Sequence, residues 1–352
     1  MAMTTLGDLF ATNATAAYEV VTSFMDRDPV TRTPFFESGL LTNNPLVQQA
    51  AASSTQIVEL PYWGDLDASV EPNYSNDQYQ DIAVPQKIGT GSLRARNAHL
   101  NEGWGVMSLV QELAASDPFE RIAARLDNYW RQEAELRVVA TLKGLLADNI
   151  ADNAGDMRID LAATALTANA IIDAQATMGD AFGDLAGIVM HSKLYFAMAK
   201  AGLTDGDSPS ATATGLRNRT VLGLPVIIND RAMTTTVATV AKNVAVFLGR
   251  DAFAYGMSEP GGVVARGFET SYALEYDREA ARGNGGGADT LWSRRNMIVH
   301  PLGYDFTSTS ITGNGTETVA RGAGWTDLAN PVNWTRRASR KQVPISFMLV
   351  NA

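Results

Sequence analysis

The most regular pattern of apolar positions in this sequence has the spacing of an α-helix and follows Asp117. Asp117 is a favourable N-cap, Pro118 suits the first helical position, and Glu120 stands three residues after the cap. No further glycine or proline occurs before Gly144. We therefore predict a helix over residues 118–147, which is about 30 residues and about 45 Å long.

The apolar face of this predicted helix changes direction along its length. Apolar residues of the first half share one face, and those of the second half share a face rotated away from it. The pattern is not a heptad seam, so we do not expect a coiled coil. Two faces require two partners, which is typical of a spine that runs along a domain and past its edge. We expect the buried side of this spine helix to include Phe119, Ile122, Leu126, Trp130 and Leu142.

Two segments before the spine helix have little apolar core of their own. Residues 1–54 are interrupted by prolines and carry apolar residues in short clusters, so we interpret them as an arm that is ordered by lying on another surface. Residues 55–108 look extended, with an acidic stretch, then a basic stretch, and no clearly apolar face. We predict a projecting β-hairpin with one acidic and one basic leg. A solvated loop is the alternative, although loops of this length are uncommon in compact domains.

The second half of the chain alternates between helix and strand patterns. Within residues 161–260 we predict a buried strand at 185–190 and a following helix whose N-cap is Ser192. Residues 261–308 return to strand-like alternation, and residues 309–352 form a polar tail with a closing apolar stretch. No internal repeat is visible, and the order of the elements favours an α+β fold.

Composition excludes several classes of protein. The 352 residues are 45% hydrophobic and 19% charged, which are values of a globular chain. There is no cysteine and there are only three histidines, so disulfides, thiol nucleophiles and a histidine-rich metal site are not expected. The net charge of −10 disfavours a surface that wraps nucleic acid. The first residues do not resemble a signal peptide, and no apolar run is long enough for a membrane span, so we expect a soluble protein made in a reducing cytosol.

Recognisable catalytic and cofactor motifs are missing from the sequence. There is no Walker loop, no Gly-X-Ser-X-Gly elbow and no His-Glu-X-X-His. His191 and Ser192 form the only adjacent base and hydroxyl, and we interpret them as a strand end and an N-cap. His300, before a proline, is interpreted as structural as well. We expect no catalytic residue, no cofactor and no metal, and we do not expect an enzyme.

Several short strings, in a fixed order, resemble the major capsid proteins of tailed bacteriophages, which share the Hong Kong-type capsid fold. They are Ser38-Gly39-Leu40, Leu60-Pro61-Tyr62-Trp63-Gly64-Asp65-Leu66, Gly187-Ile188-Val189-Met190-His191-Ser192-Lys193, Leu222-Gly223-Leu224-Pro225-Val226-Ile227, His300-Pro301-Leu302-Gly303-Tyr304, Leu328-Ala329-Asn330, Asn333-Trp334 and Arg340-Lys341. Each string is weak alone, but together they span nearly the whole chain.

The resemblance implies a division of the chain into regions. These are an N-terminal arm (1–54), an extended loop (55–108), a peripheral domain (109–160 with 261–308), an axial domain (161–260) and a C-terminal extension (309–352). It also implies self-assembly through pentamers and hexamers into an icosahedral or elongated head shell around double-stranded DNA, without sequence-specific binding. The expected location is the virion, after assembly in the bacterial cytoplasm.

Further partners follow from the same resemblance. The spine helix begins too early in the chain for a preceding scaffolding segment, so we expect a separate scaffolding protein, together with a portal. A decoration protein is a further possible partner, and no membrane is expected. Lys87 is the only lysine of the loop, and nothing in the sequence indicates that it forms a cross-link.

Charged residues are the candidates for contacts between subunits. The hairpin legs could pair with each other, or they could meet charges of a neighbouring subunit. The basic cluster near residue 340 fits a solvated or subunit-contact face, with a phosphate backbone as an alternative. The candidates are Asp65, Asp67, Glu71, Lys87, Arg94, Arg96, Arg336 and Arg337. Two other readings stay open, an encapsulin-like nanocompartment shell and an unrecognised α/β enzyme.

Overall fold

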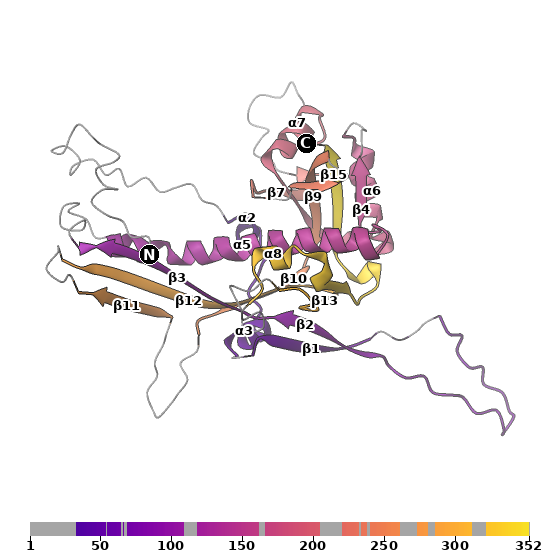
Figure 1. Ribbon diagram of the computed structural model, residues 1–352. Coiled ribbons are helices and arrows are strands. Elements are labelled where there is room, and N and C mark those ends of the chain that lie inside the picture. The colour runs from indigo at the N-terminus through magenta and orange to yellow at the C-terminus, as the bar shows by residue number, and fades with distance from the viewer. Residues whose placement is uncertain are drawn as a thin grey trace.

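The computed structural model is an α+β protein arranged around one long helix, α5, which spans Pro118–Asp152 (Figure 1). An axial sheet and two helices stand on one end of α5, a second sheet lies along its other half, and a two-stranded arm projects from the body. The structure describes residues 33–53, 55–64, 66, 69–108, 118–161, 166–204, 220–231, 234–237, 240–260, 273–280, 286–311 and 322–351.

The spine helix continues through Gly144, as predicted, and is five residues longer than its sequence predicts. A Cβ at Gly144 would lie 2.2 Å from the carbonyl oxygen of Leu328 and 2.6 Å from Nε1 of Trp334. The glycine is therefore required by a close approach of α8 (Trp325–Leu328) to the helix, and not by a turn. The predicted N-cap, Asp117, lies outside the described residues.

The two halves of α5 contact different partners. In the first half, Phe119 packs edge-on against Tyr276, and Trp130 donates a hydrogen bond from Nε1 to Oγ of Ser293 at 3.0 Å. Leu126, Trp130 and Leu142 are buried, whereas Phe119 and Ile122 are only half-buried. Among the described residues, one sheet alone covers the helix on the N-terminal side of Leu126, which explains this lower burial.

The axial sheet is a mixed sheet whose strand order is β4-β15-β9-β5-β7-β6, with β8 paired to β9. Its strands are β4 (Arg158–Leu161), β5 (Leu185–Met190), β6 (Thr220–Val221), β7 (Leu224–Ile228), β8 (Thr234–Val237), β9 (Val240–Gly249) and β15 (Ile345–Asn351). Helices α6 (Ala168–Ala176) and α7 (Ser192–Lys200) follow β4 and β5 in the chain, and a short 3-10 helix, η2 (Gly179–Asp184), leads into β5.

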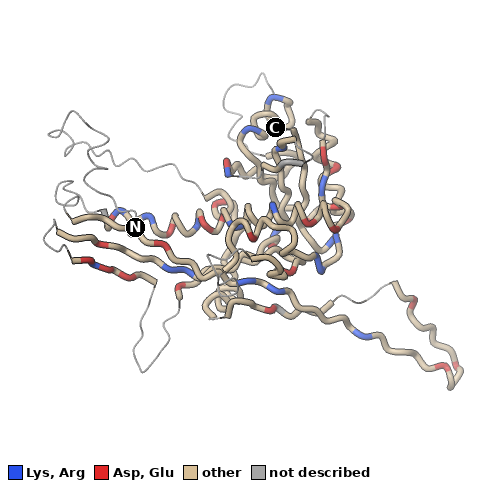
Figure 2. Tube along the Cα trace, in the orientation of Figure 1, with Lys and Arg blue, Asp and Glu red and all other residues tan. Residues whose placement is uncertain are grey.

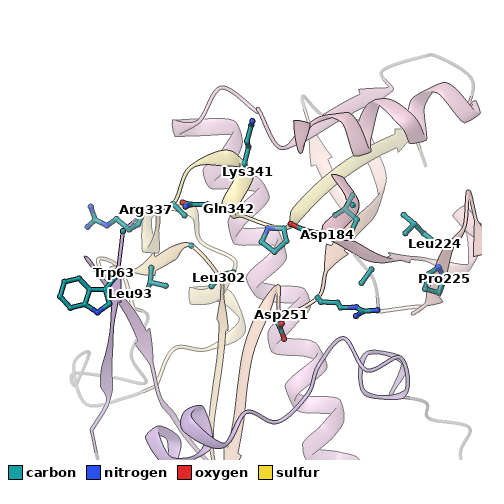
Figure 3. A pocket seen from close by; sticks show the side chains of 18 of the residues that line it. Trp63, Leu93, Asp184, Leu224, Pro225, Asp251, Leu302, Arg337, Lys341 and Gln342 are labelled. Carbon is teal, nitrogen blue, oxygen red and sulfur yellow. The ribbon is translucent and has the colours of Figure 1, made fainter. Parts of the chain in front are cut away.

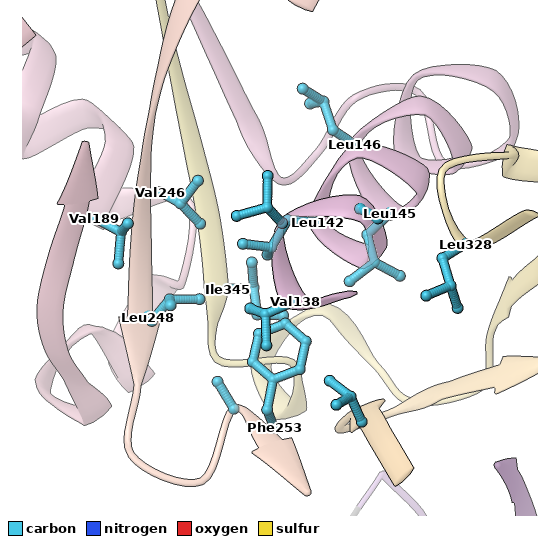
Figure 4. Close-up of a cluster of buried hydrophobic side chains, with 14 of the residues drawn as sticks. Val138, Leu142, Leu145, Leu146, Val189, Val246, Leu248, Phe253, Leu328 and Ile345 are labelled. Carbon is cyan, nitrogen blue, oxygen red and sulfur yellow. The ribbon is translucent and has the colours of Figure 1, made fainter. Parts of the chain in front are cut away.

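Alternation along the strands divides the core of this region into two layers. In β9, Val244, Val246 and Leu248 face the core that includes α5, and Ala245 and Phe247 face the core that includes α6 and α7. Figure 4 shows the first of these layers, where Val138 and Leu142 of the helix meet Val246, Leu248 and Ile345 of the sheet. Both faces of the axial sheet are therefore buried, each against one layer of the core.

The segment expected to be a polar C-terminal tail contributes a central strand instead. β15 lies between β4 and β9, parallel to the first and antiparallel to the second. Ile345, Phe347 and Leu349 are fully buried. The closing apolar stretch of the predicted tail is therefore part of the core, because it alternates between the two buried faces of the axial sheet.

The peripheral sheet consists of β3 (Ala98–Met107), β10 (Phe253–Ser258), β11 (Leu274–Glu279) and β12 (Ala288–Pro301). β3 pairs with one edge of β12, while β10 and β11 pair with successive parts of its other edge. Two boundaries therefore differ from the sequence prediction. β3 is not part of the hairpin, and β10 does not belong to the axial domain, because both are hydrogen-bonded to β12.

The described end of the N-terminal arm packs on its own chain. α2 (Pro34–Glu37) places Phe35 in the main core, and α3 (Pro45–Ala52) buries Val47 and Ala51 near β10. From Thr33 onward the arm lies on another surface, as its sequence predicted, and that surface belongs to its own chain. Residues 1–32 lie outside the described residues.

Short elements close the structure around the second half of α5. They are β13 (Tyr304–Phe306), η4 (Pro331–Asn333), β14 (Trp334–Arg336) and η5 (Arg340–Gln342). Trp334 is buried and donates from Nε1 to the carbonyl oxygen of Leu328 at 2.7 Å, which ties this region to α8. The base of the projecting arm rests near the same elements.

Candidate assembly interface

The projecting arm is a β-hairpin whose paired part is short. β1 (Ile57–Trp63) and β2 (Thr90–Arg96) are antiparallel, with a register that runs from Ile57 opposite Arg96 to Trp63 opposite Thr90. Beyond it the amide of Gly64 donates to the carbonyl of Gly89 at 2.7 Å. Residues 71–89 contain no helix or strand and extend away from the body (Figure 1). A two-stranded arm of this kind was predicted, and only its inner third is paired.

Asn97 fixes the point where the hairpin joins the body. Its side chain is buried, and Nδ2 donates to the carbonyl oxygens of Ala51 at 3.0 Å and Ser53 at 3.3 Å. The backbone amide of Asn97 donates to Gln56 at 2.8 Å. The chain therefore leaves the arm at this residue and enters the peripheral sheet, which is why β3 is not a leg of the hairpin.

Charge is divided between the outer and inner parts of the arm. Glu71, Asp77 and Asp81 lie in the outer part, and Arg94 and Arg96 lie at the base (Figure 2). The sequence predicted a contrast between the two legs, but the turn at the tip brings acidic residues onto both legs. Lys87 is exposed on the returning leg, and Asp65 and Asp67 lie outside the described residues.

The two arginines at the base bind their own chain. Arg94 Nε lies 2.9 Å from Oε1 of Glu59, directly across the strand pair, and its backbone amide donates to Asp305 at 3.0 Å. Arg96 is half-buried and donates to Oγ of Ser308 at 3.0 Å, and burial lowers its pKa. The sequence left two alternatives for Arg94, a partner in the same hairpin or a partner in a neighbouring subunit. In the structure its partner is Glu59 of the same hairpin. An exposed ion pair of this kind contributes about 0–1 kcal/mol to stability.

The outer part of the arm exposes an unusual number of large apolar side chains. Tyr79 is 98% exposed, Val84 86% and Ile82 80%. Tyr74 is also exposed, and its hydroxyl donates to Glu71 at 2.7 Å. Exposed apolar side chains gathered in one segment are typical of a surface that contacts another molecule.

A groove of about 1260 Å³ lies where the arm meets the body (Figure 3). Trp63 and Leu93 of the arm line one side, and Leu224 and Pro225 of the axial domain line the other. Arg337 and Lys341 also line it, but they pair with Asp305 at 2.6 Å and Asp180 at 2.7 Å. The groove is therefore lined by both apolar and polar side chains, and two of its cations are paired with carboxylates of the same chain.

The basic cluster near residue 340 is largely bound within the chain. Arg336 binds both carboxylate oxygens of Asp156, at 2.8 and 2.9 Å, and is mostly buried. Burial opposes ionisation of Asp156, but its hydrogen bonds to Arg336 and Asn149 outweigh this and lower its pKa. Arg340 donates to the carbonyl oxygen of Val343 at 2.9 Å. The cluster thus fastens η5 and β14 to the end of the spine helix, and it is not an open basic surface.

His191, and not Ser192, is the N-cap of α7. Nδ1 of His191 accepts a hydrogen bond from the backbone amide of Lys193 at 3.1 Å, so the helix begins one residue earlier than the sequence predicts. Ser192 Oγ lies 3.4 Å from the same nitrogen atom. Imidazole nitrogen can accept as a hydroxyl does, a role that N-cap preferences from sequence do not assign to histidine.

We expect His191→Ala to lower the free energy of unfolding by about 1 kcal/mol, because an orphan amide of the first turn loses its acceptor. The matched substitution Ser192→Ala removes no cap and should change stability by less than about 0.5 kcal/mol. Thermal unfolding of the two variants by calorimetry distinguishes them. A larger loss in Ser192→Ala than in His191→Ala would show that the hydroxyl is the cap after all.

Neither a metal cluster nor a membrane helix is found in the described part of the chain. No three His, Asp or Glu side chains of the described residues converge as metal ligands would. His300 is buried, its Nε2 lies 2.7 Å from the carbonyl oxygen of Tyr304, and burial lowers its pKa to about 4. Among the helices that the structure describes, none is both long enough and apolar enough to cross a bilayer.

Comparison with known proteins identifies relatives of the whole architecture. Residues 77–274 match the model of a family described as Major capsid protein 13-like (Gp13-like). The major capsid protein of Bacillus phage SPP1 is 30% identical over 307 residues, which are 84% of this chain and 87% of that protein.

Solved structures show the same fold at low sequence identity. One from Mycobacterium phage Bobi has a TM-score of 0.54 at 11% identity and covers 94% of each chain. The capsid of Ralstonia phage GP4 has a TM-score of 0.53 at 11% identity and covers 86% of this chain and 94% of that one. The α+β architecture is thus the phage capsid fold. Since more than half of its length matches the family model and the SPP1 protein aligns across most of both chains, this chain belongs to the Gp13-like family of phage major capsid proteins.

Proposed function

We propose that this chain assembles with copies of itself, as pentamers and hexamers, into the closed head shell of a tailed phage. The observation that carries the proposal is the projecting hairpin, whose outer part exposes Tyr79, Ile82 and Val84 to solvent. Contacts between an arm of one subunit and the body of the next are heterologous, and heterologous contacts close into rings and curved lattices. The chain acts as a structural protein and not as an enzyme.

The outer part of the hairpin is the proposed contact with the neighbouring subunit. Its apolar side chains would be removed from water there, which contributes about 1.5–3 kcal/mol for each large side chain fully buried. Glu71 and Lys87 of the same part, and the sequence candidates Asp65 and Asp67, would set register, because each exposed pair contributes only about 0–1 kcal/mol. The four arginine candidates make their contacts within their own subunit. They are Arg94, Arg96, Arg336 and Arg337.

The shell would enclose double-stranded DNA without reading its sequence. A net charge of −10 disfavours tight binding of a phosphate backbone, so DNA can enter and leave a container built from this chain. We further propose that assembly takes place in the host cytoplasm with a separate scaffolding protein and a portal, and that a decoration protein is an optional addition to the outer surface.

The test is assembly of the purified chain. Sedimentation velocity and negative-stain microscopy, with and without co-expressed scaffolding protein, should show pentamers, hexamers or closed shells. The sedimenting mass should increase with protein concentration. A chain that stays monomeric at high concentration under both conditions would contradict the proposal.

A further inference from the structure

The turn at the tip of the projecting hairpin is held in shape by polar contacts. The amide of Gln78 donates to Oδ1 of Asn76 at 2.9 Å, and the amide of Asp81 donates to the carbonyl oxygen of Gln78 at 3.1 Å. Nδ2 of Asn76 also donates to the carboxylate of Asp81. Tyr79 lies within this turn and is almost wholly exposed. A large side chain that an ordered turn presents to water is preorganised for a recess on another molecule, because binding costs it little conformational entropy.

The tip cannot use a recess at the base of its own arm. Residues 64–76 lead from the paired part of the hairpin to the turn, and an extended segment of this length spans about 40 Å. Figure 1 shows the outer part of the arm leading away from the body. The tip of one subunit therefore reaches a second subunit and not its own body.

The groove where the arm meets the body offers apolar surface for such a side chain. Trp63 is 76% exposed on the side of the arm, and Leu224 and Pro225 of β7 lie on the opposite side (Figure 3). Leu302 lines the groove as well and is exposed. The volume of about 1260 Å³ exceeds the roughly 300–1,000 Å³ of a usual small-molecule pocket, so the groove has room for a segment of polypeptide.

Charge favours the acidic outer part of the hairpin, residues 71–89, as that segment. Its charged residues are Glu71, Asp77, Asp81 and Lys87. Those that line the groove are Arg250, Arg337, Lys341, Asp184 and Asp251. Arg250 is exposed, and within the described part of the chain neither it nor the exposed Asp77 makes an ion pair through its side chain. Acidic residues predominate on the tip and basic residues in the groove, so the two surfaces attract each other.

The open edge of the peripheral sheet is a poorer match for the tip. β11 is an edge strand that exposes Leu274 and Tyr276. Three of its six residues are acidic and one is basic. Like charges that face each other across a contact oppose association, so this edge repels the carboxylates of the outer hairpin.

We propose that the tip of the hairpin, with Tyr79 as its central apolar contact, docks in the groove at the base of the neighbouring subunit's hairpin. The inference rests on the proposed assembly and names the surface that receives the arm. Each subunit then offers one tip and one groove, and Trp63 at the base of each arm contacts the next tip. Such a head-to-tail relation can close into a ring, and the arm's reach of about 40 Å sets the spacing between neighbouring subunits.

Chemical cross-linking tests the contact without background, because the chain has no cysteine. Gln80→Cys beside the turn and Pro225→Cys in the groove are both exposed positions, and this pair keeps Tyr79. Particles of the double variant, formed with co-expressed scaffolding protein, are treated with a short bis-maleimide. On a denaturing gel the monomer band should be lost in favour of a ladder of covalent multimers. The matched pair, Gln80→Cys with Asp277→Cys on β11, should remain monomeric.

The outcomes separate this inference from the proposed function. Particles of the first pair that still yield only monomers, or cross-links formed by the matched pair instead, would overturn the docking site and leave shell assembly standing. A wild-type chain that forms no particles would overturn both.

A photoreactive side chain gives a second measurement that does not depend on the cysteine variants. The residue p-benzoylphenylalanine in place of Tyr79 keeps an aromatic ring in an otherwise wild-type chain. After irradiation of the particles, cross-linked peptides should contain Trp63, β7 or η5. Peptides from β11 or α5 in their place, or particles without any cross-link between chains, would refute the proposal.

Discussion

Replacing Trp130 with alanine is expected to lower the free energy of unfolding of the subunit by about 3–5 kcal/mol. The indole is 1% exposed and lies between the spine helix and β12. Its removal leaves a cavity and also leaves the buried hydroxyl of Ser293 without its donor, at 3.0 Å in the native protein. Urea unfolding followed by circular dichroism measures the loss.

Two further variants separate the causes. Trp130→Phe keeps an aromatic ring but loses the donor to Ser293, so its loss should be smaller than that of alanine and should exceed zero. Lys143→Ala changes an exposed position of the same helix and should stay within about 0.5 kcal/mol of wild type. If Trp130→Ala and Lys143→Ala had equal free energies of unfolding, Trp130 would not be packed between α5 and the peripheral sheet as described.

A triple substitution in the outer hairpin, Tyr79→Asp with Ile82→Asp and Val84→Asp, is expected to abolish shells and leave the subunit folded. All three side chains are at least 80% exposed, so the free subunit loses little by their replacement. In a subunit contact each of them would contribute about 1.5–3 kcal/mol. Every 1.4 kcal/mol is about tenfold in affinity, so together their loss weakens each contact by at least a thousandfold. Circular dichroism and negative-stain microscopy of one preparation give both readouts.

The matched control keeps the apolar character of the tip. Tyr79→Phe with Ile82→Val and Val84→Ile should form particles as the wild type does. Normal particles from the aspartate variant would mean that the outer hairpin is not a contact between subunits.

Local patterns in the sequence predicted the local elements well. The strand over residues 185–190 is β5, and the helical periodicity after Pro118 is α5, because both signals reside in neighbouring residues. The order of short strings indicated the capsid fold, and the family comparison confirms it. The burial of Leu126, Trp130 and Leu142 could be predicted, because the periodicity of apolar residues along a helix indicates which face is packed.

Features that depend on distant partners could not be predicted in the same way. Glycine disfavours a helix interior, and only the approach of Leu328 and Trp334 explains the place of Gly144 inside α5. Arg336 looked free because its acceptor, Asp156, is far away in the chain.

The central position of β15 affects how quickly a newly made subunit completes its folding. Met157 and Ser346 are hydrogen-bonded although they are 189 positions apart, and β15 pairs with β4 at the same separation. Pairings between such distant segments form late, because the chain between them loses conformational entropy before any contact stabilises the pairing. Until then β9 lacks its neighbour on one side, and an open strand edge pairs readily with other chains. The rate at which this one strand is inserted therefore sets how long each new chain stays prone to aggregation.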